Sequence, residues 1–256
     1  MPLLKLNEKL AGVLGKKQEV KVPEHSVSEM AEVLAGIDDT GWGMYAFRHE
    51  ILEGKFTDEQ KKAYIAAANA CGKEEARKLR LKYPKETAET IARDLGFTIR
   101  MKSTPTGGGH VIFAEYEEPD RITVYTDAAD RGNEILKSDG ISESISNLSV
   151  VETLIAHELF HGIEYRNRDE IYTQTERIEL WKKPFSNRSR IRCLSEIAAM
   201  AFARELLQTK VSPFILDVLL VFSYNSEAAS ALYEEICDAA EFPIGQNEMN
   251  KEDNRC

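Results

Sequence analysis

The sequence predicts an α+β protein that is mostly helical and has one small three-stranded antiparallel sheet. Most of its 256 residues fall in segments with apolar side chains at helical spacing, bounded by helix caps and breakers. Between Phe97 and Thr126 the apolar period changes from about 3.6 to about 2, which is typical of strands. A third observation is the apolar helical run from Val150 to Tyr165, which contains the pattern H-E-x-x-H.

The first 83 residues are predicted to be a helical accessory region, residues 1–83. Residues 1–24 are polar and irregular. The sequence from Ser26 to Glu29 is a capping-box pattern, which begins a short helix that ends near Gly36. Two glycines in Gly41-Trp42-Gly43-Met44 predict a turn.

A second helix of this region begins at the capping sequence Thr57-Asp58-Glu59-Gln60 and runs to about Tyr83. Pro84 ends it, because the residue before a proline avoids the helical conformation. A DNA-binding helix-turn-helix is the alternative interpretation of the region, and its acidic first half disfavours that alternative.

Residues 84–243 are predicted to form the core, which begins with a helix from Lys85 to Gly96. Three antiparallel strands are expected next, at 97–101, 111–116 and 121–126. Polar loops with glycine or proline separate the strands, at 104–109 and 117–120.

Four helices are expected after the strands, at 150–165, 196–207, 212–222 and 225–239. Ser212 with Pro213 and Asn225 with Ser226 supply the signals that begin the last two. Their apolar faces are expected to close the core. Residues 244–256 are polar and are predicted to be a disordered tail.

The pentapeptide His157-Glu158-Leu159-Phe160-His161 lies in the first of these four helices. Residues four apart share one face of a helix, so both imidazoles can bind one ion at roughly 2.0–2.1 Å. Glu158, rotated by about 100° from His157, can then act as general base on a water at that ion. This layout predicts a zinc-dependent hydrolase. The alternative is a pair of hydrogen-bonded core histidines in an ordinary amphipathic helix.

A catalytic zinc ion requires a third protein ligand and one open position. No histidine follows His161 in the chain, so a carboxylate is expected. Glu196 is the best candidate, because it begins an alanine-rich helix that can approach the H-E-x-x-H helix closely. It could instead be a first-turn glutamate that only stabilises the helix dipole. The rival carboxylates are Glu152, Glu164, Glu176, Glu179 and Glu205.

The order of these elements and motifs resembles the ImmA/IrrE family of zinc metallopeptidase-like proteins. The resemblance covers roughly residues 84–220 and depends on two strings, H-E-L-F-H and E-x-x-A-x-x-F-A-x-E-L-L. It implies a zincin-like core with a gluzincin-type site, in which His157, His161 and Glu196 bind zinc and Glu158 is the catalytic base. Members of the family often cut or antagonise a regulatory protein, so it also implies a specific protein substrate such as a transcriptional regulator.

Composition and charge disfavour several other classes of protein. The formal net charge of −10 argues against nucleic acid as the main partner, because phosphate binding needs a concentrated basic surface. No run approaches about 18 consecutive apolar residues, and the first residues lack the apolar core of a signal peptide, so a cytoplasmic protein without a membrane span is expected. The four cysteines form no C-x-x-C pair, which predicts reduced thiols.

One basic run precedes Glu196 and is expected at the rim of the metal cleft. The segment from Trp181 to Arg192 has no acid and five cations, Lys182, Lys183, Arg188, Arg190 and Arg192. A solvated loop is one interpretation of this run. A docking surface for an acidic protein segment is the other.

Other parts of the chain could assist the reaction. An exposed strand edge beside a metal can hold an extended peptide, so the predicted sheet is a candidate platform for substrate. His110, Tyr165 and Tyr172 are candidates for stabilising a tetrahedral intermediate, or are ordinary surface residues. The predicted function is a zinc metallopeptidase. The alternatives are a non-catalytic regulator that keeps zinc for structure, and a zinc hydrolase of a non-peptide amide.

Overall fold

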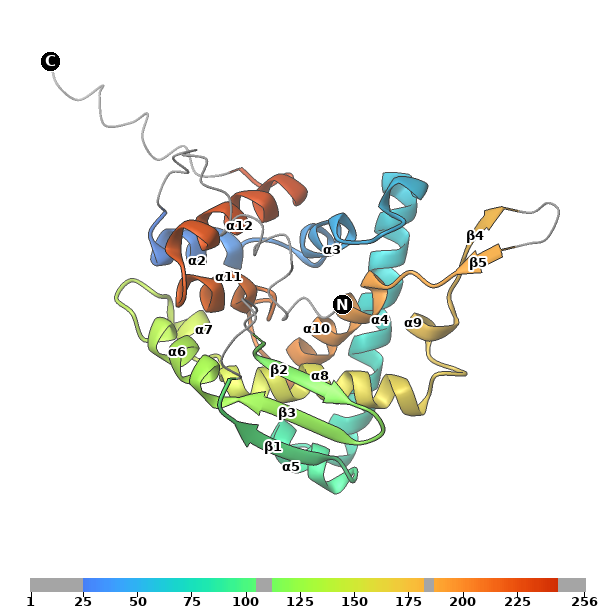
Figure 1. Ribbon diagram of the computed structural model, residues 1–256, viewed down its shortest axis with the longest axis horizontal. Helices are drawn as coiled ribbons and strands as arrows, with labels where there is room; N and C mark the ends of the chain where they lie inside the picture. Colours follow the sequence, from blue (N-terminus) through green and yellow to red (C-terminus); the bar gives the residue numbers. More distant parts are fainter. Residues whose placement is uncertain (1–24, 105–111, 182–186, 244–256) are drawn as a thin grey trace, which may run out of the picture.

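The computed structural model describes residues 25–104, 112–181 and 187–243. These residues form a mostly helical α+β structure with one three-stranded and one two-stranded sheet (Figure 1). The predictions for residues 1–24 and 244–256 lie outside the described residues. Within the described ranges, no helix is both long enough and apolar enough to cross a membrane.

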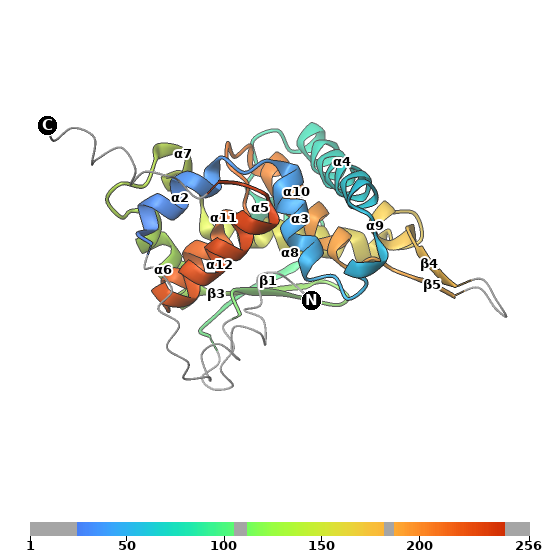
Figure 2. The ribbon, with the colours of Figure 1, turned by 90° about the horizontal axis from the view of Figure 1, so that it is seen from above.

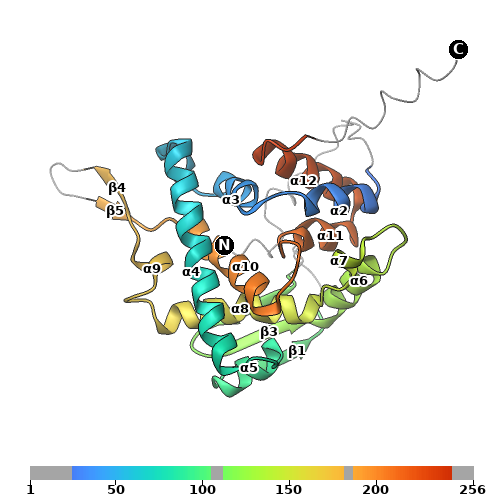
Figure 3. The same ribbon diagram turned by 180° about the vertical axis from the view of Figure 1, so that it is seen from behind.

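Helix α8 (Val150–Arg166) lies between the three-stranded sheet and two layers of helices. Strands of the sheet pack on one side of α8, and α10 (Cys193–Leu207) packs on the other. Helix α4 (Asp58–Lys82) covers α10 in turn, so the order in Figure 2 is sheet, α8, α10 and α4. Figure 3 views the molecule from behind and shows α4 crossing in front of this stack. Burial on two sides explains why α8 is apolar nearly all round, with 12 of its 17 residues buried.

The three-stranded sheet is mixed, so the prediction of an antiparallel sheet is wrong. Strands β2 (Ala114–Glu117) and β3 (Arg121–Tyr125) form the expected antiparallel hairpin, but β1 (Thr98–Lys102) pairs with β3 in parallel. Successive strands along the chain alternate in direction, as in the predicted antiparallel sheet. Only their order in the sheet, β1-β3-β2, differs from the prediction. The reason is burial: β3 is buried from Ile122 to its end and takes the centre, whereas β1 buries only Ile99 and takes an edge.

The turn predicted at residues 41–44 is also wrong, because helix α3 (Asp39–Arg48) runs through it. Trp42 stacks on Phe214, with ring centroids 5.4 Å apart and planes 7° from parallel. A Cβ added at Gly43 would lie 2.4 Å from Ile65 of α4. The glycine therefore allows two helices to approach closely, and this packing outweighs its poor helix propensity.

Most predicted helices are confirmed, with small changes of their ends. Capping boxes at Ser26 and Thr57 begin α2 and α4 as expected, and Asn225 caps α12. Besides α4, α8 and α10, the predicted helices that the structure contains are α2 (Val27–Ala35), α5 (Ala88–Asp94), α11 (Ile215–Phe222) and α12 (Ser226–Ala239). Further elements were not predicted: η1 (Glu53–Lys55), α6 (Thr126–Leu136), α7 (Glu143–Ser146), α9 (Tyr172–Thr175), β4 (Ile178–Trp181) and β5 (Asn187–Ser189).

The helices of the predicted accessory region share one buried hydrophobic cluster with α8 and α10. Met30 and Ile65 belong to it together with Leu159 and Phe202. Helix α4 touches the backbone of α10, because a Cβ added at Gly72 would lie 2.0 Å from the carbonyl oxygen of Ala198. The position of α10, and of the residues in its first turn, is therefore supported from both sides.

Candidate metal centre

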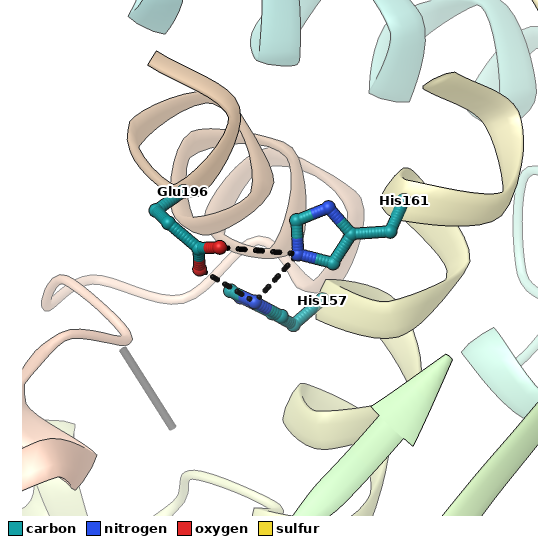
Figure 4. A group of neighbouring side chains, drawn as sticks. All are labelled: His157, His161 and Glu196. Carbon is teal, nitrogen blue, oxygen red and sulfur yellow. Dashed lines mark hydrogen bonds and ion pairs between the residues drawn. The ribbon is translucent and has the colours of Figure 1, made fainter. Parts of the chain in front are cut away.

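Three side chains from α8 and α10 converge in the interior of the protein. His157 and His161 lie one turn apart on α8, and Glu196 lies in the first turn of α10 (Figure 4). The Nε2 atoms of the two histidines are 3.1 Å apart. The carboxylate oxygens of Glu196 lie 3.3 Å from Nε2 of His157 and 3.8 Å from Nε2 of His161. The candidates chosen from the sequence are therefore in contact.

The three residues fit a divalent metal ion. Ligand atoms about 2.0–2.1 Å from a tetrahedral ion are about 3.3–3.4 Å from one another, and the observed separations lie on both sides of that value. Two imidazole nitrogens and a carboxylate oxygen leave one position open on such an ion. His157 is fully buried, and its Nδ1 atom has no hydrogen-bond partner in the described ranges. This buried group can therefore hold a metal ion.

Glu164 and Ser195 hold the outer ring nitrogen of His161. Nδ1 of His161 is 3.6 Å from Oε2 of Glu164 and 3.2 Å from the hydroxyl of Ser195. The Ser195 hydroxyl also donates to Oε2 of Glu164 at 2.7 Å. Thr173 donates to the other oxygen of this buried carboxylate. These contacts turn Nε2 of His161 toward Glu196.

The charges in the metal-free site are strongly coupled. Burial alone would lower the pKa of His161, but the bond to Glu164 and the charges of Glu196 and Glu158 raise it to about 9. Burial would raise the pKa of Glu196, yet the bond to His157 and the charge of His161 lower it. His161 is therefore protonated and Glu196 ionised near neutral pH, so a metal ion must displace a proton.

Asp217 on α11 is a further buried acid near this site. Both of its carboxyl oxygens lack a hydrogen-bond partner among the described residues. Burial and the charge of Glu196 raise its pKa well above the usual range. Asp217 is therefore uncharged near neutral pH, whereas Glu196 is ionised.

Glu158 is 2 % exposed and faces a hollow of about 390 Å³ beside the three residues. The walls of this hollow include β2, α8, α9 and the segment that leads into α10. Its lining residues are Glu115, Tyr116, Glu158, His161, Thr173, Gln174, Arg190, Ile191, Arg192, Ser195 and Glu196. The position expected for a general base therefore opens on space that a small ligand or peptide segment can enter.

The rival carboxylates are placed elsewhere, apart from Glu164. Glu152 accepts a hydrogen bond from the backbone of Ala88 at the start of α5. Glu205 pairs with Arg77 of α4. Glu176 and Glu179 follow α9, outside the group of potential ligands. Glu164 approaches the site, but it contacts the outer nitrogen of His161 and not the three ligand atoms.

The candidates for stabilising a tetrahedral intermediate lie in different parts of the protein. His110 lies outside the described residues. Tyr165 lines a second hollow that adjoins the first, whereas Tyr172 lines a separate one with Cys71. Tyr116, which was not a candidate, lines both adjoining hollows. Ser195 was also missed, and its position directly before Glu196 is the only signal in the sequence.

The cations of the basic run do not all lie at the same place. Arg190 and Arg192 line the hollow beside the metal-binding group, as expected of a segment at its rim. Arg188 lies on β5 and lines neither adjoining hollow. Lys182 and Lys183 lie outside the described residues.

The cysteines that the structure describes do not belong to the group of potential metal ligands. Cys71, Cys193 and Cys237 are free thiols, which confirms the sequence prediction for the three that the structure describes. Burial raises the pKa of Cys71 and of Cys237 to about 11. Such thiols are protonated near neutral pH and are poor metal ligands.

Comparisons of the chain with protein-family models, with curated proteins and with solved structures gave no match.

Proposed function

We propose that the protein is a zinc-dependent metallopeptidase that cleaves a specific regulatory protein. The observation that carries this proposal is the convergence of His157, His161 and Glu196 next to Glu158, at the wall of an open hollow. Two histidines and a glutamate are a known ligand set of catalytic zinc. The resemblance of the sequence to ImmA/IrrE proteins supports the same assignment.

Zinc bound by these three residues would polarise a peptide carbonyl and lower the pKa of a water toward about 7. Glu158 lines the hollow together with His161 and Glu196, and it is not one of the three candidate ligands. It accepts a proton from the attacking water and donates it to the leaving amine. His161 is held in its orientation by Glu164 and Ser195 during these steps.

Strand β2 supports a peptide as the substrate. It is an edge strand of the sheet, and two of its residues, Glu115 and Tyr116, line the hollow beside the metal ligands. An extended peptide can add to such an edge through backbone hydrogen bonds, which hold the chain without fixing its sequence. A hollow of about 390 Å³ is near the lower end of the size of ligand sites, so it admits a chain segment and not a folded surface.

The substitution Glu158→Gln tests the proposal. Glutamine keeps the shape of the side chain but cannot accept a proton, so we expect cleavage to fall by at least about a hundredfold. Zinc content and the unfolding temperature should stay unchanged. The assay is digestion of a degenerate peptide library by zinc-loaded protein, with the new termini identified by mass spectrometry.

Glu170→Gln is the matched control, because Glu170 is exposed just beyond the end of α8. It should cleave like the wild type. If a cellular phenotype is lost with His157→Ala but fully kept with Glu158→Gln, the metallopeptidase proposal is wrong. A regulator that keeps zinc only for structure would then explain the phenotype.

A further inference from the structure

Three arginines border the cleft around the candidate metal centre. Arg190 and Arg192 line the hollow that contains Glu158. Arg168 lines a second hollow of about 330 Å³. The two hollows adjoin, because both are lined by Tyr116, His161, Gln174 and Arg190. We call Arg168, Arg190 and Arg192 the arginine rim.

No carboxylate in the described ranges pairs with the arginine rim. The guanidinium of Arg190 donates to the neutral amide oxygen of Gln174. Arg168 lies over the ring of Tyr165, with its guanidinium carbon 5.5 Å from the ring centroid. Some arginines away from the cleft pair with acids, among them Arg48 with Asp238, Arg77 with Glu205 and Arg204 with Asp39. Three guanidinium groups without a paired carboxylate among the described residues therefore meet at the cleft.

The fold holds part of this rim close to the metal ligands. Ile191 is 1 % exposed and anchors the chain between Arg190 and Arg192. Arg192 is the N-cap of α10, and Glu196 follows it in the first turn. The two arginines therefore move with the helix that positions a metal ligand.

Five carboxylates also line the two hollows, and two of them, Glu158 and Glu196, belong to the candidate metal centre. Glu115 accepts a hydrogen bond from the hydroxyl of Tyr125 at 2.6 Å. Glu164 is engaged with Thr173 and Ser195. Glu118 is the remaining acid of the second hollow. An incoming carboxylate can therefore bind the guanidinium forks of the rim, which match its two oxygens.

We propose that the arginine rim selects substrates with an aspartate or glutamate side chain close to the cleaved bond. Because Arg190 and His161 line the same two hollows, this side chain lies close to that bond. The inference rests on the proposed function and adds the class of substrate to it. Hydrogen bonds to a charged group are stronger than those to a neutral one. We therefore expect substrates with an acidic side chain to be preferred about tenfold over those with the corresponding amide.

The test is a degenerate peptide library cleaved by the zinc-loaded protein. We expect acidic residues to be enriched about tenfold near the cleaved bond with the wild type. Arg190→Glu should abolish that enrichment and favour lysine and arginine there. Arg188→Glu is the matched control, because Arg188 carries the same charge a few residues away, on β5 opposite Glu179. It should leave the enrichment unchanged.

Cleavage without enrichment of acids would overturn the inference and leave the proposed function intact. An equal change with Arg188→Glu would also overturn it, since a diffuse basic surface would then act in place of the rim.

If no peptide is cleaved, the proposed function is wrong and a binding assay decides the inference separately. Fluorescence anisotropy would compare peptides that differ only by aspartate, asparagine or phosphoserine, with zinc-loaded wild type and Arg190→Glu. Tighter binding of the aspartate peptide, lost in Arg190→Glu, supports a carboxylate. Equal binding of the aspartate and asparagine peptides, or tighter binding of the phosphoserine peptide, overturns that assignment.

Discussion

Glu164 lies one turn beyond His161 on α8, and its Oε2 atom is 3.6 Å from Nδ1 of His161. Ser195 of α10 bridges the two groups, 3.2 Å from the ring and 2.7 Å from the carboxylate. Helix α10 thus supplies a candidate metal ligand, Glu196, and the hydroxyl that holds another ligand in place. A ligating histidine whose outer N–H is bound in this way keeps its orientation and is a better ligand.

Removal of this support should weaken metal binding without abolishing it. We expect Glu164→Gln and Ser195→Ala to lower zinc affinity by about 10-fold to 100-fold, because the ring of His161 loses its partner. Competition with a chromogenic chelator measures the affinity. Glu170→Gln is the control and should bind zinc like the wild type. Unchanged affinity in both variants would show that the contacts to Nδ1 have no role in metal binding.

The three ligands should each be required for full metal content. His157→Ala, His161→Ala and Glu196→Ala should fall well below the one zinc per chain expected of the wild type, because two protein ligands hold the ion weakly. Elemental analysis of the purified proteins measures the content. Glu176→Ala and Glu205→Ala should keep full zinc. A variant Glu196→Ala with full zinc and unchanged affinity would mean that another carboxylate is the third ligand.

Zinc binding should strengthen as pH rises. The pKa of His161 in the metal-free site is about 9, so zinc displaces a proton at neutral pH and its affinity should rise about tenfold per pH unit up to that value. Calorimetry in buffers of different ionisation enthalpy would detect about one released proton at pH 7. Affinity that does not change between pH 7 and 9 would contradict the protonated state of His161.

The stability of the metal-free protein should fall, and not rise, as the pH increases. Because the pKa of His161 is raised on folding, from 6.5 to about 9, its protonation stabilises the fold fully below pH 6.5. That contribution is lost as pH rises through about 9. The unfolding temperature without zinc should therefore fall over this range, and His161→Gln should remove this part of the pH dependence.

Gly162, directly after His161, should not tolerate a side chain. A Cβ at this position would lie 2.3 Å from the ring of Phe97, which is buried and lies under the guanidinium of Arg166. Gly162→Ala should destabilise the protein by about 1–3 kcal/mol, the usual cost of overpacking a core. Urea unfolding measures the change. Gly54→Ala is the control, since nothing lies within 4 Å of an added Cβ there. Equal stability of the two variants would contradict close packing at Gly162.

The sequence by itself determined the features that depend on neighbouring residues. The capping signals at Ser26, Thr57 and Asn225 begin helices where expected, because a cap bonds backbone groups within three residues of it. The four-residue spacing of His157 and His161 places both rings on one face of α8, and their Nε2 atoms are 3.1 Å apart. Helical geometry alone is sufficient for that result.

Only the tertiary structure decided the features that join distant residues. The order of the strands followed from which strand is buried, and the helix at Gly43 followed from packing against Ile65. Glu196 was one of several carboxylates in the sequence, and the approach of α10 to α8 brought it to both histidines. The physical reason is the same in each case. These contacts depend on how buried surfaces fit together, and a pattern of neighbouring residues does not contain that information.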